Sequence, residues 1–405
     1  MDVLMISPGY PAEMAQFTRG LAQVGARVIG LGDQHVDALP PTARDALTHH
    51  LHVRSLTDER AALDAVASVL GHVRFERVEC LWEPYMGLAA RLREALGVRG
   101  LTGEQTERFR DKELMKQRLD QAGIRTPWHQ TATTADGVRA IAERIGYPLI
   151  VKPIAGYGSA DTYRVDDAGQ LEQVLPLLRP VPVVSVEEFV DGEEFTYDTI
   201  CADGRVLFEN IGWYRPRPLV MRQNEWISPV YVALRDLEVP DLQGGREMGR
   251  AVLDALGFRD GFTHMEWYRK PDGEVVFGEI GARSPGARTV EVMNHATESD
   301  LFVAWAEAVV HGRVSRPIER RHNAAAVFKR ARGQGRITHV EGLTRLLSEY
   351  GDHVVTLDLA PIGAPRKDWR ASVTADGVLI VRHPNLGATL EMADRFAAEL
   401  HLHAA

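Results

Sequence analysis

The sequence contains few cysteines and no long apolar run. Only two of its 405 residues are cysteines, Cys80 and Cys201, and they lie far apart in apolar surroundings. A disulfide framework or a cysteine-ligated zinc site is therefore not expected, whereas two reduced, buried thiols are typical of a cytosolic protein. Because no stretch of about 18 consecutive apolar residues occurs, the sequence also predicts no membrane-spanning helix.

An excess of positive charge is absent as well. The 47 Lys and Arg residues are outnumbered by 56 Asp and Glu residues, which gives a formal net charge of -9. Non-specific binding to nucleic acids or to acidic membranes requires a basic surface, so neither is an expected partner. The first residues, MDVLMISPGY, lack the basic and long apolar segments of a secretory signal. We therefore expect a cytoplasmic protein.

Two common nucleotide-binding motifs are missing. The glycines of residues 1–100 do not form GxGxxG after a strand, and no GxxxxGK[ST] loop occurs anywhere in the chain. These absences exclude the dinucleotide fingerprint and the P-loop. A phosphate site in this protein must therefore be built from other residues.

One candidate phosphate site follows the apolar strand PLIVK, which ends at Lys152 and leads into AGYGSAD. An ammonium group next to a glycine-rich turn can hold one anion together with free backbone N–H groups. Gly156 and Gly158 would let the backbone approach the anion closely, and Ser159 would add a hydroxyl donor. An ordinary flexible turn is the alternative interpretation.

The hydrophobic pattern predicts three units. In residues 1–102, short apolar strands alternate with helical segments, which favours an α/β domain with a parallel sheet. Residues 103–320 combine strands, Gly-containing turns and helices, as an α+β region does. Residues 321–405 have the strand and helix pattern of a smaller α+β module.

The segment THMEWYRKPDGEVVFGEIGAR, residues 263–283, predicts a β-hairpin that brings two glutamates together. Asp272-Gly273 favours a two-residue turn, and counting back from that turn places Glu266 directly opposite Glu279. Like charges opposed on one sheet face are destabilising. They are tolerated if one is protonated, if a basic side chain bridges them, or if a hard cation lies between them. The alternative is that both side chains point into solvent.

The same register predicts the two faces of the hairpin. One face would carry His264, Glu266, Tyr268 and Lys270 opposite Gly281, Glu279, Phe277 and Val275. The other face would carry Met265, Trp267, Val276 and Ile280, which we expect to pack in the core because strand side chains alternate.

Five motifs in order resemble the ATP-grasp superfamily, and within it the carboxylate–amine ligases, which include amino-acid ligases. The motifs are DKELMK, PLIVKPIAGYGSAD, VEEFVDGEEFTYD, THMEWYR and FGEIGARSPG. The resemblance covers residues 1–320 and extends more loosely into the tail. It implies the ATP-grasp fold, with an N-terminal domain over 1–102, an ATP-grasp domain over 103–320 whose lid spans about 125–190, and a C-terminal module over 321–405.

The resemblance also implies the cofactors ATP and Mg²⁺, or Mn²⁺, and assigns roles to single residues. Lys112 and Lys152 would contact the phosphates, under a lid formed by the glycine loop. Glu187, Glu188 and Phe189 would form the hinge against adenine, and Glu194, with Glu193 as the alternative, would meet the ribose. Glu266 and Glu279 would hold the metal, and Arg283 would meet the γ-phosphate or an acyl phosphate. Solvated surface charges are the alternative for Lys112 and the four hinge-region glutamates.

Four arginines are candidates for substrate binding. Residues 213–226, WYRPRPLVMRQNEW, predict an irregular loop in which Arg215, Arg217 and Arg222 lie among aromatic residues. Arginine can bind a carboxylate by a two-pronged contact, so this loop is a candidate for recognising a substrate, against a solvated surface loop. Arg288 is a further candidate near the paired glutamates, as is His264.

The resemblance implies a ligase that activates a small-molecule carboxylate as an acyl phosphate and joins it to an amine, such as an amino acid. Dimers are common in this superfamily, which makes a second copy of the chain a candidate partner. A carboxylase-like or nucleotide-precursor ligase is the alternative within the superfamily, and a nucleotide-binding regulator without turnover is the alternative outside catalysis. Gly281 keeps the regulator open, since many members carry asparagine there, two residues after the second metal-binding glutamate.

Overall fold

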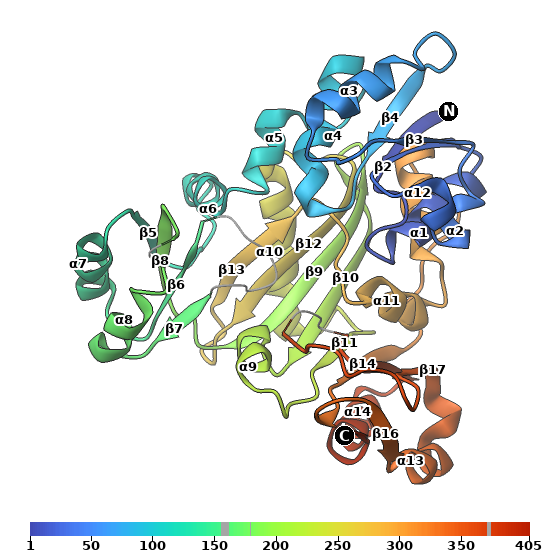
Figure 1. Cartoon of the computed structure of the whole chain (residues 1–405). Helices are drawn as coiled ribbons and strands as arrows, with labels where there is room; N and C mark the ends of the chain where they lie inside the picture. The colour runs from blue at the N-terminus through green and yellow to red at the C-terminus, as the bar shows by residue number, and fades with distance from the viewer. Residues whose placement is uncertain (155–161, 179, 371–373) are drawn as a thin grey trace.

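The computed structural model describes residues 1–154, 162–178, 180–370 and 374–405, which form three sheet-based units around the longest sheet (Figure 1). Gly156, Gly158 and Ser159, predicted as a phosphate-binding loop and lid, lie outside the described residues. Lys152, at the end of the strand before them, is described.

The N-terminal domain contains a four-stranded parallel sheet in the order β3-β2-β1-β4, as the alternating pattern predicted. Its central strand is apolar and completely buried from Val3 to Ile6, as expected for a parallel sheet covered on both faces. The strands are β1 (Asp2–Ile6), β2 (Arg27–Gly32), β3 (His49–His52) and β4 (Phe75–Glu79). The main helices are α1 (Met14–Gln23), α2 (Pro41–Arg44), α3 (Glu59–Ala67) and α4 (Met86–Leu96).

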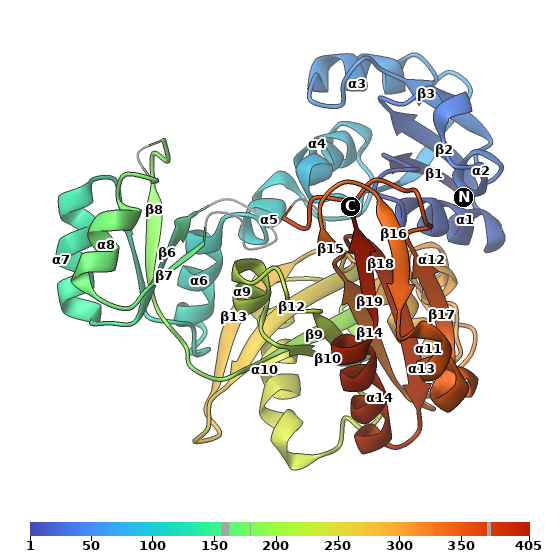
Figure 2. The same ribbon diagram turned by 60° about the horizontal axis from the view of Figure 1, so that its bottom comes forward.

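A small antiparallel sheet, in the order β5-β8-β6-β7, extends from the rest of the molecule (Figure 2). Its strands are β5 (His129–Ala132), β6 (Leu149–Pro153), β7 (Tyr163–Val165) and β8 (Val184–Glu188). Helix α7 (Ala135–Ile145) starts at Thr134, whose side chain accepts from the Gly137 N–H. Its apolar positions pack on the sheet with α8 (Ala168–Val174). Helices α5 (Gly103–Arg108) and α6 (Lys112–Gln121) connect this unit to the N-terminal domain.

The largest sheet has eight strands in the order β13-β12-β9-β10-β11-β14-β18-β17. It runs without a break from the central region into the C-terminal residues, because β11 pairs with β14. Its strands are β9 (Glu193–Ala202), β10 (Arg205–Arg215), β11 (Val230–Ala233), β12 (Gly261–Arg269), β13 (Val275–Gly281), β14 (Asn323–Lys329), β17 (Val354–Leu359) and β18 (Gly377–His383).

Helices and a third sheet complete the fold. The helices are α9 (Pro218–Gln223), α10 (Pro240–Leu256), α11 (Thr289–Thr297), α12 (Leu301–His311), α13 (Leu343–Tyr350) and α14 (Leu386–Glu399). The short sheet is formed by β15 (Arg332–Gly333), β16 (Ile337–Glu341) and β19 (His401–Ala404). The prediction of an irregular loop over 213–226 is wrong in part, because β10 continues to Arg215 and α9 follows it.

The β12–β13 hairpin pairs Glu266 with Glu279, as predicted, although the predicted turn is wrong. The Lys270 N–H donates to the Glu274 carbonyl at 2.9 Å, so three residues, 271–273, form the loop. This extra loop residue shifts the register by one position near the turn. A bulge at Gly278 shifts the register back, and the two differences cancel at the glutamates.

The bulge also changes which side chains share a face. Phe277 is paired with Trp267, and both are completely buried in the core. The prediction that Phe277 and Val275 lie on the face of the glutamates is therefore wrong. Val276 is completely buried, as predicted, but it opposes Tyr268 on the glutamate face rather than on the face of Trp267. The two glutamates keep their predicted face only because the bulge lies between them and these residues.

Gly278 can be tested directly, since a Cβ there would lie 2.8 Å from the Glu266 carbonyl oxygen. Gly278→Ala is expected to lower the free energy of unfolding by about 1–3 kcal/mol, because the backbone beside Glu266 must move to accept the methyl group. Gly71→Ala is the matched control, since a Cβ at Gly71 would meet no heavy atom within 4 Å. Equal denaturant midpoints for the two variants would contradict the role of the bulge.

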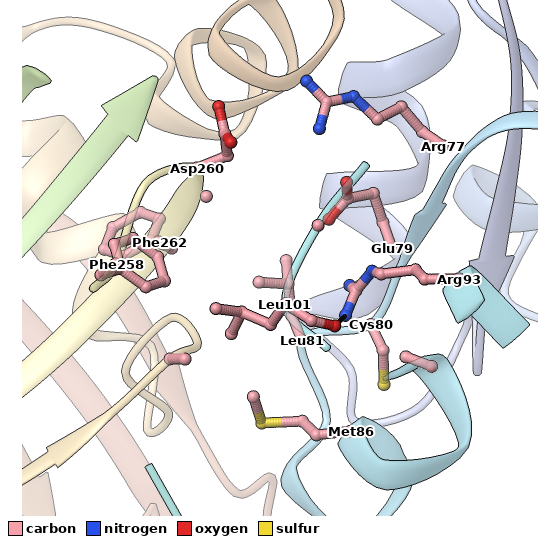
Figure 3. Close-up of a pocket in the computed structure, with 14 residues that line it drawn as sticks. Arg77, Glu79, Cys80, Leu81, Met86, Arg93, Leu101, Phe258, Asp260 and Phe262 are labelled. Atoms are coloured by element: carbon pink, nitrogen blue, oxygen red, sulfur yellow. Dashed lines mark hydrogen bonds between the residues drawn. The ribbon is translucent and has the colours of Figure 1, made fainter. Parts of the chain in front are cut away.

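A small cavity lies where the N-terminal domain meets the start of β12 (Figure 3). It has room of about 20 Å³ and is lined by Glu79, Arg93, Phe258 and Asp260 among others. This volume corresponds to about one water molecule. Burial raises the pKa of Glu79, which points into the cavity between Arg77 and Arg93. The cavity is too small for a nucleotide or an amino acid, so the functional site lies elsewhere.

Candidate active site

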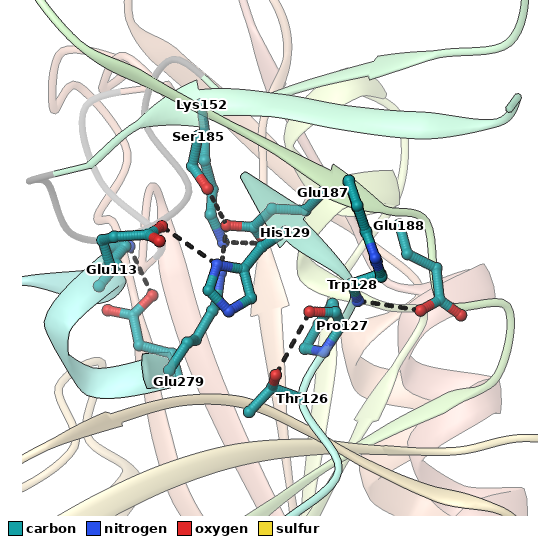
Figure 4. Close-up of polar contacts among 12 residues, drawn as sticks. Glu113, Thr126, Pro127, Trp128, His129, Lys152, Ser185, Glu187, Glu188 and Glu279 are labelled. Atoms are coloured by element: carbon teal, nitrogen blue, oxygen red, sulfur yellow. Dashed lines mark hydrogen bonds and ion pairs between the residues drawn. The ribbon is translucent and has the colours of Figure 1, made fainter. Parts of the chain in front are cut away.

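Charged side chains from α6, the small sheet and the β12–β13 hairpin meet between the two sheets (Figure 4). Helix α6 contributes lysines from its first two turns, β6 contributes the lysine at its end, and β8 contributes a buried glutamate. The hairpin contributes its two opposed glutamates. Four of the residues predicted for phosphate and metal binding are thus brought together from segments far apart in the sequence, namely Lys112, Lys152, Glu266 and Glu279.

Lys112 forms an ion pair with one of the two opposed glutamates. Asp111 caps α6 by accepting from the Glu113 and Leu114 N–H groups at 2.9 Å each, which starts the helix at Lys112. The Lys112 ammonium lies 2.5 Å from Glu279 Oε2. Burial favours the neutral acid, but Lys112 and the nearby Lys152 outweigh it and lower the pKa of Glu279. A basic group therefore keeps Glu279 ionised.

Glu187 lies between two lysines. Its carboxylate is only 3% exposed and pairs with Lys116 and, at 2.8 Å, with Lys152. The Ser185 hydroxyl donates to the same carboxylate at 2.9 Å. Burial opposes ionisation, but the two ammonium groups hold the pKa of Glu187 well below its usual range. Glu187 thus anchors the lysine that the sequence assigned to phosphate.

Lys116 was not among the predicted site residues, although its spacing from Lys112 indicated a shared helix face. It follows Lys112 by four residues in DKELMK, and residues four apart lie on the same face of a helix. The helix therefore presents two ammonium groups toward the same space, one to Glu279 and the other to Glu187.

Glu188 and Glu187 face opposite sides of β8, as neighbouring strand residues do. Glu188 accepts two hydrogen bonds from Arg125, at 2.9 and 3.0 Å, and one from the Trp128 N–H at 3.1 Å. Figure 4 shows this carboxylate pointing away from Lys152. Of the two hinge glutamates, only Glu187 contacts the lysines.

Glu194 is buried near the start of β9. It lies opposite Tyr268 on β12, whereas the alternative, Glu193, pairs with Arg269. Arg217 Nε donates to Glu194 Oε2 at 3.2 Å. Burial and the nearby Glu266 carboxylate nevertheless raise the pKa of Glu194 to about 8. Of the two alternatives for a ribose contact, Glu194 is therefore the one on the same sheet face as Glu266.

A buried polar network lies behind Glu266. His264 Nδ1 is 2.6 Å from Asp198 Oδ1, and the other Asp198 oxygen accepts from Thr196 and Asn210 at 2.8 and 3.0 Å. Burial disfavours the charged imidazole, but Asp198 outweighs it and raises the pKa of His264 to about 9. Opposite His264 is Gly281, where a Cβ would lie 3.4 Å from Arg283 Cγ, an ordinary contact. Packing alone therefore does not require glycine at this position.

The N-terminal domain contributes two carboxylates to the end of the hairpin. Arg283 Nε donates to Glu83 Oε2 at 2.6 Å, and the Arg288 N–H donates to Glu13 Oε1 at 2.9 Å. Glu83 follows β4 and Glu13 follows β1. The carboxyl ends of neighbouring parallel strands are common positions for ligand-binding residues. That rule could have identified both glutamates from the sequence.

The predicted substrate arginines do not gather in one place. Arg215 pairs with Asp394 at 2.7 Å, and Arg222 reaches the Arg370 carbonyl at 3.5 Å. The Arg288 guanidinium is held by Glu291 and Asp358, at 2.7 and 2.6 Å. Arg217, in contrast, lies beside Glu194 and the hinge.

Neither a metal-binding cluster nor a membrane-spanning helix is found in the part of the chain that the structure describes. Within this part, no group of three or more His, Cys, Asp or Glu side chains could hold a metal ion. No helix in the same part is long and apolar enough to cross a membrane.

Comparisons with known sequences match one part of the chain to a family and a larger part to two relatives. Residues 109–211 match the model of the ATP-grasp domain. The L-arginine-specific L-amino acid ligase of Bacillus subtilis is 26% identical over 255 residues, covering 59% of this chain and 58% of that protein. The protein y4rH of Sinorhizobium fredii is 28% identical over 270 residues, covering 65% of this chain and 54% of that protein. The chain thus spans somewhat more than half the length of these curated relatives.

Solved structures match the whole chain. The crystal structure of an L-amino acid ligase from Bacillus licheniformis has a TM-score of 0.80 and 22% identity, covering 100% of this chain and 98% of the other. The N5-carboxyaminoimidazole ribonucleotide synthetase from Thermotoga maritima has a TM-score of 0.73 and 17% identity, covering 100% and 99%. At these identities the similarity establishes a shared fold.

Proposed function

Because this chain belongs to the ATP-grasp superfamily, as its five motifs predicted, we propose that it is an ATP- and Mg²⁺-dependent carboxylate–amine ligase. The observation that carries this proposal is the directly opposed pair Glu266 and Glu279 with Lys112 and Lys152 around it. Two relatives are named as L-amino acid ligases, which supports an amino acid as one substrate.

The paired glutamates fit a hard cation. Carboxylate oxygens are the ligands that Mg²⁺ prefers, and it is commonly held by one or two carboxylates plus substrate phosphates. Lys112 keeps Glu279 ionised, and the Tyr214 hydroxyl is 3.5 Å from Glu266 Oε1. Mg²⁺ held by these two residues would supply charge neutralisation at the terminal phosphates.

The proposed reaction has two steps. The substrate carboxylate attacks the γ-phosphorus of ATP, giving an acyl phosphate and ADP, and the amine then attacks the acyl carbon and releases phosphate. The protein need only position the reactants and stabilise charge, as in other phosphoryl transfers. Lys112, Lys152 and Arg283 provide positive charge where the negative charge accumulates. Arg283 is held by Glu83, whose Oε2 accepts from Arg283 Nε at 2.6 Å.

Phosphate release from ATP tests the proposed function. The chain would be incubated with ATP, Mg²⁺ and a panel of amino acids, singly and in pairs. We expect release only when a carboxylate and an amine donor are both present, and none after the metal is chelated. ATP binding without release under every pairing would favour a regulatory protein. Release that needs bicarbonate and a purine precursor would favour another ligase of the superfamily.

A further inference from the structure

Arg217 occupies an unusual position among the residues expected to hold the nucleotide. Its guanidinium lies over two aromatic rings, 5.0 Å from the Phe189 centroid and 4.7 Å from the Tyr268 centroid. It also donates to the Val190 carbonyl at 2.8 Å and to Glu194 at 3.2 Å. The Arg217 side chain thus contacts the segment 189–190, the Tyr268 ring on β12 and the buried Glu194 carboxylate on β9.

The Arg217 backbone is tied to α9, because its carbonyl accepts from the Met221 N–H at 3.1 Å. Arg330, itself largely buried, donates to the Met221 and Asn224 carbonyls at 2.9 and 2.8 Å. These contacts bind the C-terminal end of the short helix that begins directly after Arg217. A fixed backbone and two aromatic contacts limit the rotamers of the guanidinium. Arg217 is therefore a preorganised group rather than a mobile surface arginine.

Glu194 depends on this contact. Its side chain is almost completely buried, and among the described side chains Arg217 is the one that donates a hydrogen bond to it. A buried carboxylate without a partner is strongly disfavoured. Because Arg217 bonds to Oε2, the other oxygen, Oε1, is left to accept from a ligand. A pair of vicinal hydroxyl groups is a ligand that can donate to such an oxygen.

We infer that Arg217 is a positioning residue of the nucleotide site, which holds Glu194 for the ribose hydroxyls and thereby selects ATP over 2′-deoxy-ATP. This inference rests on the proposed function only in requiring that ATP binds between the two sheets. It differs from the prediction that Arg217 binds a substrate carboxylate, since that role needs a guanidinium free to turn toward the substrate.

Calorimetry with ATP and 2′-deoxy-ATP, in the presence of Mg²⁺, tests the inference on the full chain. Arg217→Ala is expected to weaken ATP binding by roughly ten- to a hundredfold, the usual range for losing a hydrogen bond to a charged group. Binding of 2′-deoxy-ATP should weaken less, so that the ratio of the two dissociation constants falls toward one. Arg217→Lys keeps one donor for Glu194 and should restore part of the ratio, which a merely structural role would not predict.

The matched control is Arg269→Ala. Arg269 also pairs with a glutamate of β9 and lies over an aromatic ring, but its partners are Glu193 and Phe195 on the opposite face. This variant should leave the nucleotide ratio unchanged. Tighter ATP binding by Arg217→Ala, or equal weakening of both nucleotides, would overturn the inference. If the alanine variant does not fold, the lysine variant decides, since an unchanged ratio there with weaker binding of both nucleotides would also overturn it.

The readout separates this inference from the ligase proposal. Nucleotide affinities are measured without turnover, so a wild-type chain that binds ATP but releases no phosphate would refute the ligase and leave the ratio test intact. A wild-type chain that binds both nucleotides equally would refute ribose selection and leave the ligase intact. A chain that binds neither nucleotide would refute both.

Discussion

Glu279→Gln is expected to lower the rate of ATP turnover by more than about a hundredfold, the usual loss when one group that stabilises developing charge is removed. The substitution keeps the size of the side chain but removes the negative charge that pairs with Lys112 at 2.5 Å and opposes Glu266. An amide also binds Mg²⁺ less well than a carboxylate does, so more metal should be needed for half-maximal rate. A coupled assay of ADP formation, run over a range of Mg²⁺ concentrations, measures both effects.

Glu274→Gln is the matched control for this prediction. Glu274 lies at the start of the same hairpin arm, but its carboxylate pairs with Lys270 and Arg125, away from the site. The control should keep nearly full turnover, because partly exposed ion pairs contribute little. Equal rates for the two variants would remove Glu279 from the proposed metal site. A folded Glu279→Gln protein that needs no extra Mg²⁺ would remove it as well.

The fold and the pairing of Glu266 with Glu279 were predicted correctly from the sequence. The ordered motifs predicted the ATP-grasp fold, which is confirmed, and strand alternation predicted the N-terminal parallel sheet. The predicted pairing of Glu266 with Glu279 is correct, but the rules for two-residue turns and strand alternation do not explain why. A three-residue turn and a bulge at Gly278 compensate each other, and this combination places Phe277 and Trp267 together in the core.

Tertiary contacts account for what the sequence did not predict. Lys116 and Glu187 pair across 71 positions, and Glu83 and Arg283 across 200. Contacts between residues so far apart produce no periodic pattern in the sequence from which they could be predicted. The positions of the arginines at the end of β10 and just after it are also set by partners from elsewhere in the chain, since Arg215 pairs with Asp394 whereas Arg217 pairs with Glu194. Residue type indicated that these arginines bind carboxylates, but not which ones.

The roles of single residues in binding ATP stay predictions. The structure shows, however, that the lysines predicted to bind phosphate already have carboxylate partners. Lys112 and Glu279 lie in contact, and so do Lys152 and Glu187. Arriving phosphates would therefore meet lysines that already have carboxylate partners. Exchange of these carboxylates for phosphate oxygens would keep the charge of each lysine compensated, which limits the desolvation penalty of binding for the two lysines.

Glu187→Ala is expected to lower the free energy of unfolding by about 3–5 kcal/mol, the usual loss when one partner of a buried ion pair is removed. The substitution would leave Lys116, which is 1% exposed, and Lys152 without their shared carboxylate. Denaturant unfolding at neutral pH measures the loss. Since an uncharged lysine needs no partner, stability of the variant should recover as the pH rises toward the ordinary pKa of lysine.

The neighbouring Glu188 provides the control variant, and the pH dependence provides a second test of Glu187. The Glu188 carboxylate pairs with the partly exposed Arg125, so Glu188→Ala should lower the free energy of unfolding by less than about 1 kcal/mol.

The pKa of Glu187 is lower in the folded than in the unfolded chain. The contribution of Glu187 to stability is therefore present above its unfolded-state pKa and is lost as the pH falls through its folded-state pKa. The difference in stability between wild type and Glu187→Ala should therefore shrink on acidification. A constant difference would show that Glu187 stabilises the site by packing and not by its charge.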